Sequence, residues 1–97
     1  MLDKSFHHEL EKYISDYLEI MKHWKKGGSP RAHQILKYEN PYDFFYGFAV
    51  GEIEGFSSGF FQGIYNRLPN EHEFREIEEI IEVHYKDMRG ILSKSMK

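Results

Sequence analysis

A glycine occurs at every fourth position through the middle of the chain. The series is Gly47, Gly51, Gly55, Gly59 and Gly63, within the segment YGFAVGEIEGFSSGFFQGIY. Residues four apart lie on one face of an α-helix, so this spacing predicts a helix with a line of glycines along one side. Each interior glycine costs about 0.5 to 1 kcal/mol relative to alanine, and close contact with another helix backbone can offset that cost. The series therefore predicts helix packing, and by itself it indicates no reaction.

A strand and a membrane span are the two alternatives for this segment. A period of four is also a multiple of two, so a strand would place all five glycines on one face, but glycine weakens a strand. Residues 42–65 are long enough to cross a bilayer, yet Glu52 and Glu54 stand at the centre, where carboxylates are costly. We therefore expect a helix, and we expect no membrane span.

Capping signals set the bounds of this central helix. Asn40-Pro41 combines a capping residue with a proline at the first helical position, and Leu68-Pro69 ends the helix. The predicted range is about 41–67.

A last helix is predicted to begin after Asn70, because Glu73 completes the spacing of a capping box. Its apolar residues recur at steps of three and four, and His84 occupies the remaining slot of the stripe. These apolar residues are Phe74, Ile77, Ile81, Met88 and Ile91.

The first helix is predicted to begin near Asp3 or Ser5 and to end with two lysines before Gly27-Gly28. Ser29-Pro30 then opens a short helix that runs to about Tyr38. The apolar stripe of the first helix is Phe6, Leu10, Tyr13, Tyr17, Ile20 and Trp24, widened by Ile14, Leu18 and Met21.

These elements predict an all-α fold: one domain, residues 1–97, built as a small bundle of three long helices and one short helix. The 97-residue chain has no cysteine, which excludes a disulfide framework and a thiolate zinc site. A formal charge of −3 makes nucleic-acid binding an unfavoured function. The N-terminal residues lack the pattern of a signal peptide, so we expect a cytoplasmic protein.

The central helix has more apolar surface than three helices can cover, and we therefore predict a homodimer. The glycine line winds through roughly 160° between its ends, so it needs either a steeply crossing partner or two partners. The alternative is a monomer whose glycine helix is wedged between its two neighbours. The predicted interface consists of the five glycines with Phe48, Phe56 and Phe60 of the adjoining ridge.

A candidate polar site is centred on Glu52, the one carboxylate on the aromatic ridge. A short turn at 67–70 makes the last two long helices antiparallel, which places Glu52 level with His84 or Tyr85. A structural hydrogen bond or ion pair is one interpretation of Glu52 and His84. The other is a metal site, in which a two-fold axis brings two copies of each ligand together. No cofactor is predicted apart from this metal ion.

The segment HWKKGGSPRAH, residues 23–33, is the second candidate site. Lys25, Lys26 and Arg31 flank a glycine turn that opens a helix, an arrangement that can bind an anion. The simpler interpretation is a set of cations at a helix C-terminus followed by a connector.

The leading functional hypothesis is a homodimeric scaffold or regulator that acts by association with itself and, in a wider role, with another protein. A metal- or ligand-binding bundle centred on Glu52 and His84 is the first alternative. An anion- or nucleic-acid-binding module is the second. Catalysis is the least supported function, because no serine or cysteine nucleophile pairs with a base.

Overall fold

The computed structural model describes residues 2–24 and 40–95. The regular secondary structure in these residues is entirely helical. Four helices follow one another, and this part of the chain contains no strand, so the all-α prediction is confirmed. The helices are α1 (Lys4–Met21), α3 (Pro41–Tyr65), α4 (Glu71–Glu82) and α5 (Tyr85–Ser95). The short helix predicted for residues 30–38 lies outside the described residues.

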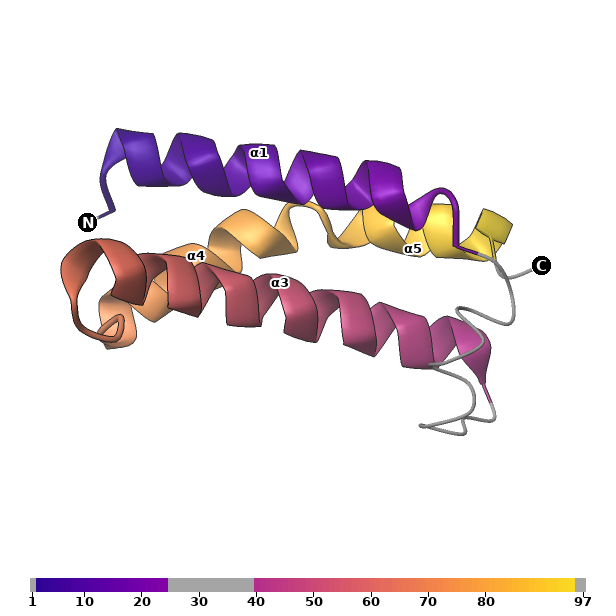
Figure 1. The fold of residues 1–97 in the computed structure, drawn as a ribbon. Helices are drawn as coiled ribbons and strands as arrows, with labels where there is room; N and C mark the ends of the chain where they lie inside the picture. Colours follow the sequence, from indigo (N-terminus) through magenta and orange to yellow (C-terminus); the bar gives the residue numbers. More distant parts are fainter. Residues whose placement is uncertain (1, 25–39, 96–97) are drawn as a thin grey trace.

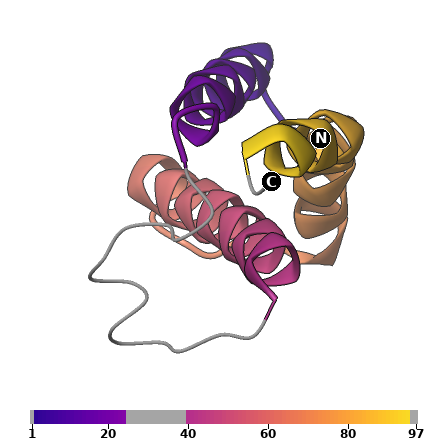
Figure 2. The same ribbon diagram turned by 90° about the vertical axis from the view of Figure 1, so that its right-hand side faces the viewer.

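Three rods pack side by side: α1, α3, and α4 followed by α5 (Figure 1). α3 runs antiparallel to α1, and the chain then turns back through α4 and α5 (Figure 1). Seen end-on, the three rods occupy the corners of a triangle (Figure 2). Each rod therefore contacts both of the others and leaves one side facing outward.

The first rod, α1, ends at Met21, earlier than the predicted end before Gly27-Gly28. Asp3 occupies the N-cap position, but its side chain makes no capping hydrogen bond to α1. Its Oδ2 instead accepts a hydrogen bond of 2.5 Å from the Tyr65 hydroxyl at the far end of α3. Ile20, which the sequence assigned to the apolar stripe, is 57% exposed. The buried residues of α1 are Phe6, Leu10, Ile14, Tyr17 and Met21.

Two asparagines bound α3. The Asn40 side chain accepts a hydrogen bond from the Asp43 backbone N–H at 3.1 Å, and Pro41 follows as the first helical residue. Asn66 adopts a left-handed conformation with φ 56°, which ends the helix after Tyr65. The helix is thus two residues shorter than the predicted range of 41–67.

The turn between α3 and α4 carries the predicted capping box, which is confirmed. The Asn70 side chain accepts from the Glu73 N–H at 2.9 Å, and the Glu73 carboxylate accepts from the Asn70 N–H at 2.8 Å. Arg67 also binds both oxygens of Glu73, at 2.7 and 2.9 Å. The Arg67 guanidinium and the Asn70 N–H together lower the pKa of Glu73 to about 2.

The prediction of one continuous last helix is wrong, because the chain breaks at Val83 and His84. The His84 N–H bonds to the Ile81 carbonyl at 2.9 Å, and the His84 carbonyl accepts from Met88 N–H to begin α5. The break falls on the one polar residue of the predicted apolar stripe. A straight helix would direct the His84 imidazole toward the core, whereas the turn carries it to α1.

The core lies along the axis of the triangle and takes residues from every rod. α3 contributes Phe45, Ala49, Ile53 and Phe61, with Ser57 between them. The Ser57 hydroxyl is satisfied by a 2.7 Å hydrogen bond to the Ile53 carbonyl one turn earlier. The last rod contributes Ile77, Ile80, Ile81, Met88 and Leu92. No helix among the described residues is long and apolar enough to cross a membrane.

Candidate functional site

The glycine ridge, Gly47, Gly51, Gly55, Gly59 and Gly63, is exposed along its whole length. A Cβ atom built on any of these glycines meets no heavy atom within 4 Å in the described part of the chain. None of the described helices therefore uses the close approach that the glycines permit. Among the described residues, α1, α4 and α5 pack on other sides of α3 and do not wedge the glycines between them, and the choice between monomer and dimer stays a prediction.

Residues four apart along α3 form four ridges on its surface. Each ridge has a different environment. The buried ridge (Phe45, Ala49, Ile53, Ser57, Phe61) faces the core. The aromatic ridge (Phe44, Phe48, Glu52, Phe56, Phe60, Ile64) faces α1, and the polar ridge (Tyr46, Val50, Glu54, Ser58, Gln62) borders α5, where Tyr46 contacts Tyr85. The glycine ridge lies opposite the buried ridge and faces away from the bundle.

Ring-to-ring contacts join the aromatic ridge to α1. Tyr13 stacks on Phe56 with ring centroids 3.6 Å apart, and Phe6 stacks on Phe60 at 5.1 Å. The outer edges of this ridge nevertheless remain in contact with solvent, since Phe48 is 42% exposed and Phe56 37% exposed. An apolar border thus runs beside the glycine ridge.

Glu52 lies on the aromatic ridge, as predicted, and its partner is on α1. The Tyr17 hydroxyl donates a short hydrogen bond to Glu52 Oε2. Burial raises the pKa of Tyr17 first of all, and the hydrogen bond to Glu52 raises it further. The phenol therefore stays protonated and acts as a donor to the carboxylate.

The predicted pairing of Glu52 with His84 is not what the structure forms. His84 Nε2 lies 2.8 Å from Glu11 Oε2 on α1, and the His84 side chain is 15% exposed. Tyr85 lies edge-on to Tyr46, with ring centroids 6.1 Å apart. The antiparallel turn does bring this region of the last rod beside α3, but it faces the polar ridge, and Glu52 faces α1.

A metal site built on Glu52 and His84 gains no support from this geometry, because the two side chains bind different residues of α1. No group of three or more metal-ligating side chains occurs among the residues that the structure describes. The predicted anion site at Lys25, Lys26 and Arg31 lies outside those residues.

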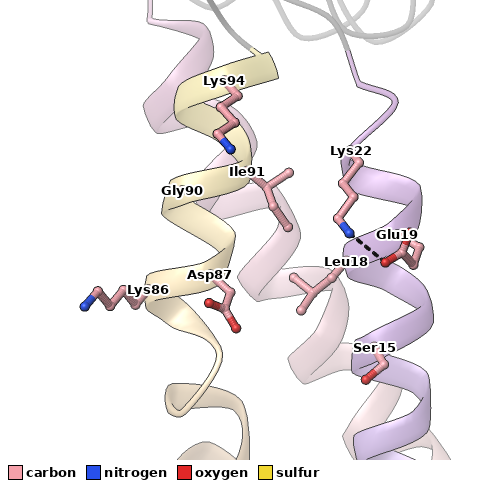
Figure 3. A pocket seen from close by; sticks show the side chains of 9 residues that line it. All are labelled: Ser15, Leu18, Glu19, Lys22, Lys86, Asp87, Gly90, Ile91 and Lys94. Atoms are coloured by element: carbon pink, nitrogen blue, oxygen red, sulfur yellow. Dashed lines mark hydrogen bonds and ion pairs between the residues drawn. The ribbon is translucent and has the colours of Figure 1, made fainter.

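A groove between α1 and α5 was missed by the sequence reasoning. It has a volume of about 660 Å³, and Leu18 of α1 and Ile91 of α5 point into it from opposite sides (Figure 3). Lys22 forms a 2.7 Å ion pair with Glu19 on one rim, while Asp87 and Lys94 line the other rim (Figure 3). Charges of both signs alternate here, so the groove favours neither an anion nor a cation. No sequence signal marks it, because it depends on how two distant helices pack.

Comparison with known protein families, with curated proteins and with solved structures finds nothing that matches this chain.

Proposed function

We propose that the protein acts by association, as a homodimeric scaffold or regulator whose two copies meet along the glycine ridge of α3. The exposure of all five glycines carries this proposal. An outward-facing helix surface in a monomer is normally occupied by long polar side chains, which favour both the helix and its solubility. Here the same surface is bare backbone beside phenylalanine rings.

The exposed glycines make α3 less stable than alanines would. Five interior glycines cost about 2.5 to 5 kcal/mol relative to alanines in the same helix, from about 0.5 to 1 kcal/mol each. No contact within the described residues offsets this cost, since a Cβ at each position would meet open space. A second helix backbone lying against the ridge would offset it through dispersion and Cα–H to carbonyl contacts.

The shape of the surface fits a second copy of α3. The glycine ridge lies between the aromatic and polar ridges, and it follows the i±4 direction of the helix. Two such ridges can pack against each other at a crossing angle near −40 to −50°. Gly55 is the central member of the series, so a two-fold axis beside it would use the whole ridge of both copies. Phe48 and Phe56 would pack at the border of that contact.

The test compares two glycines that have equally open surroundings. Gly55→Leu places a side chain in the middle of the proposed interface, whereas Gly90→Leu places one on α5, where a Cβ also meets nothing within 4 Å. At both positions the added Cβ atom meets no heavy atom of the described residues within 4 Å. Native mass spectrometry and sedimentation are expected to give a dimer for the wild type and for Gly90→Leu, and a folded monomer for Gly55→Leu.

Two outcomes would overturn the proposal. One is a wild-type protein that remains a monomer at every concentration measured. The other is a Gly55→Leu variant whose mass matches that of the wild-type dimer. Circular dichroism of each variant establishes that its helices are formed.

A further inference from the structure

A second hollow opens between the end of α1 and the aromatic ridge, beside the hydrogen bond from Tyr17 to Glu52. Its volume is about 380 Å³, within the usual range for small-molecule sites. Four aromatic side chains and two carboxylates line it: Tyr13, Tyr17, Trp24, Phe48, Asp16 and Glu52. A site with this composition differs from an ordinary apolar pocket, which has few carboxylates.

The rings stand at steep angles to one another, so they form walls rather than a stack. Trp24 is edge-on to Tyr17, with an interplanar angle of 82° and centroids 5.9 Å apart. Trp24 and Phe48 are 6.1 Å apart at 65°, and Tyr13 and Tyr17 are 6.0 Å apart at 42°. The four rings therefore line the hollow in different orientations, without forming a parallel stack.

The charged groups of the hollow have one sign. Asp16 and Glu52 both line it, and among the described residues no lysine, arginine or histidine does so. The Tyr17 hydroxyl holds the Glu52 carboxylate in place. The pKa of Tyr13 is raised, as is that of Tyr17, by burial first and then by Glu52, so both phenols remain neutral. The hollow thus combines two carboxylates with neutral rings.

We propose that this hollow binds a small quaternary ammonium ligand, with the cationic head against the rings and the carboxylates at its side. Methylated ammonium groups are large, weakly hydrated cations that gain from the faces of several rings at once. A magnesium or calcium ion takes oxygen ligands and would gain little from the aromatic rings that make up most of the lining. An anionic ligand would be repelled by the two carboxylates.

This site and the proposed dimer are tested separately. Phe48 lines the hollow and also borders the proposed dimer contact, whereas Asp16, Trp24 and Glu52 line the hollow alone. Ligand binding is measured by titration and association by mass, so one proposal can fail while the other stands.

Choline is a suitable probe because a neutral molecule of the same shape exists, 3,3-dimethylbutan-1-ol. Trp24 is the only tryptophan of the chain and lines the hollow, so its fluorescence reports on occupancy. Titration with choline is expected to give a saturable change in this fluorescence. The neutral isostere is expected to bind at least about tenfold more weakly, since it lacks the charge that the rings and carboxylates attract.

Three variants test which carboxylates contribute to choline binding. Asp16→Asn removes an exposed carboxylate that lines the hollow, and Glu52→Gln removes the one bound to Tyr17. Each is expected to weaken choline binding about threefold to tenfold, a typical effect of losing one partner of a charged pair. Glu19→Gln is the matched control: Glu19 is also on α1, but it pairs with Lys22 and lines the other groove.

The proposal is overturned if choline produces no saturable change, or if the neutral isostere binds as well as choline. It is also overturned if Asp16→Asn, which leaves the Tyr17 hydrogen bond intact, binds choline as the wild type does. Unchanged binding in Glu19→Gln together with weaker binding in Asp16→Asn would support it, whatever the stability of Glu52→Gln.

Discussion

The buried ridge and the glycine ridge lie on opposite sides of the same helix and share the same period of four. One is buried in the core, and the other is exposed. Phe45, Ala49, Ile53, Ser57 and Phe61 are buried, whereas a Cβ atom on any of the five glycines would meet no heavy atom of the other described helices within 4 Å. The residues of the first ridge are explained by packing within one chain. Those of the second are not, since an isolated chain would be more stable with alanines there.

The contrast shows that a glycine series predicts a close contact without saying which molecule makes it. Inside the bundle, the side of α3 that meets its neighbours carries ordinary core residues. The glycines lie on a side of α3 that none of the other described helices covers. This is the reason for preferring a second copy as the partner.

Truncating a side chain of the buried ridge is expected to destabilise the fold most. Ile53 is fully buried, and Ile53→Ala is expected to lower the free energy of unfolding by about 2 to 5 kcal/mol through lost burial and a residual cavity. Ile64 is on the same helix and 48% exposed, so Ile64→Ala is expected to cost much less. Urea denaturation measures both, and equal losses would contradict the assignment of the two sides.

The next effect concerns the turn that folds α4 back against the buried ridge. The pKa of Glu73 is lowered to about 2 in the folded protein, so the unfolded chain binds its proton at a higher pH. Stability from this group is present above the unfolded pKa of about 4.3 and is lost as the pH falls toward 2. Denaturation between these pH values is expected to show a steeper loss for the wild type than for Glu73→Gln.

Glu71→Gln is the control for this pH dependence. Glu71 is in the same first turn of α4, but its contact with Arg75 is a loose 3.9 Å pair between exposed side chains. Its replacement should leave the steep loss below pH 4.3 in place. A Glu73→Gln profile as steep as that of the wild type would show that this carboxylate is not the group responsible.

Exchanging glycine and alanine between the two ridges is expected to have the smallest effect on stability. Gly51→Ala is expected to raise the stability of the single chain by about 0.5 to 1 kcal/mol, because the added methyl group favours the helix and meets no neighbour. Ala49→Gly, two residues away on the buried ridge, is expected to lower it by at least that amount. Denaturation at dilutions where the protein is monomeric measures both. A loss of stability in Gly51→Ala would mean that the chain itself packs against this glycine.

The local elements of the fold were predictable because their causes are local. The capping box at Asn70 and Glu73, and the asparagine and proline that open α3, depend on residues a few positions apart. The all-helical architecture follows from apolar periodicity in the same way. The sequence shows that His84 is a polar residue within an apolar stripe. It does not show whether the helix continues through such a position or breaks there.

The candidate site was predicted only in part. Glu52 was identified from its place among phenylalanines, but its partner was assigned to the wrong helix. A short turn between two antiparallel helices fixes which of their residues are level, because both helices rise equally per residue, but it leaves open which ridge faces which neighbour. The hollow at Tyr17 and the groove at Leu18 were missed because each joins residues from two separate rods.

The central helix, its capping asparagine, the capping box of α4 and the spacing of the glycine ridge could be read from the sequence, since each depends on residues within one segment. The break at His84, the covering of the aromatic ridge by α1 and the outward position of the glycine ridge came from tertiary packing. Rotating α3 about its axis changes no local interaction, so local sequence leaves that rotation open. Only the combined burial of side chains from all three rods fixes that rotation, and with it the partners of Glu52 and the exposure of the glycines.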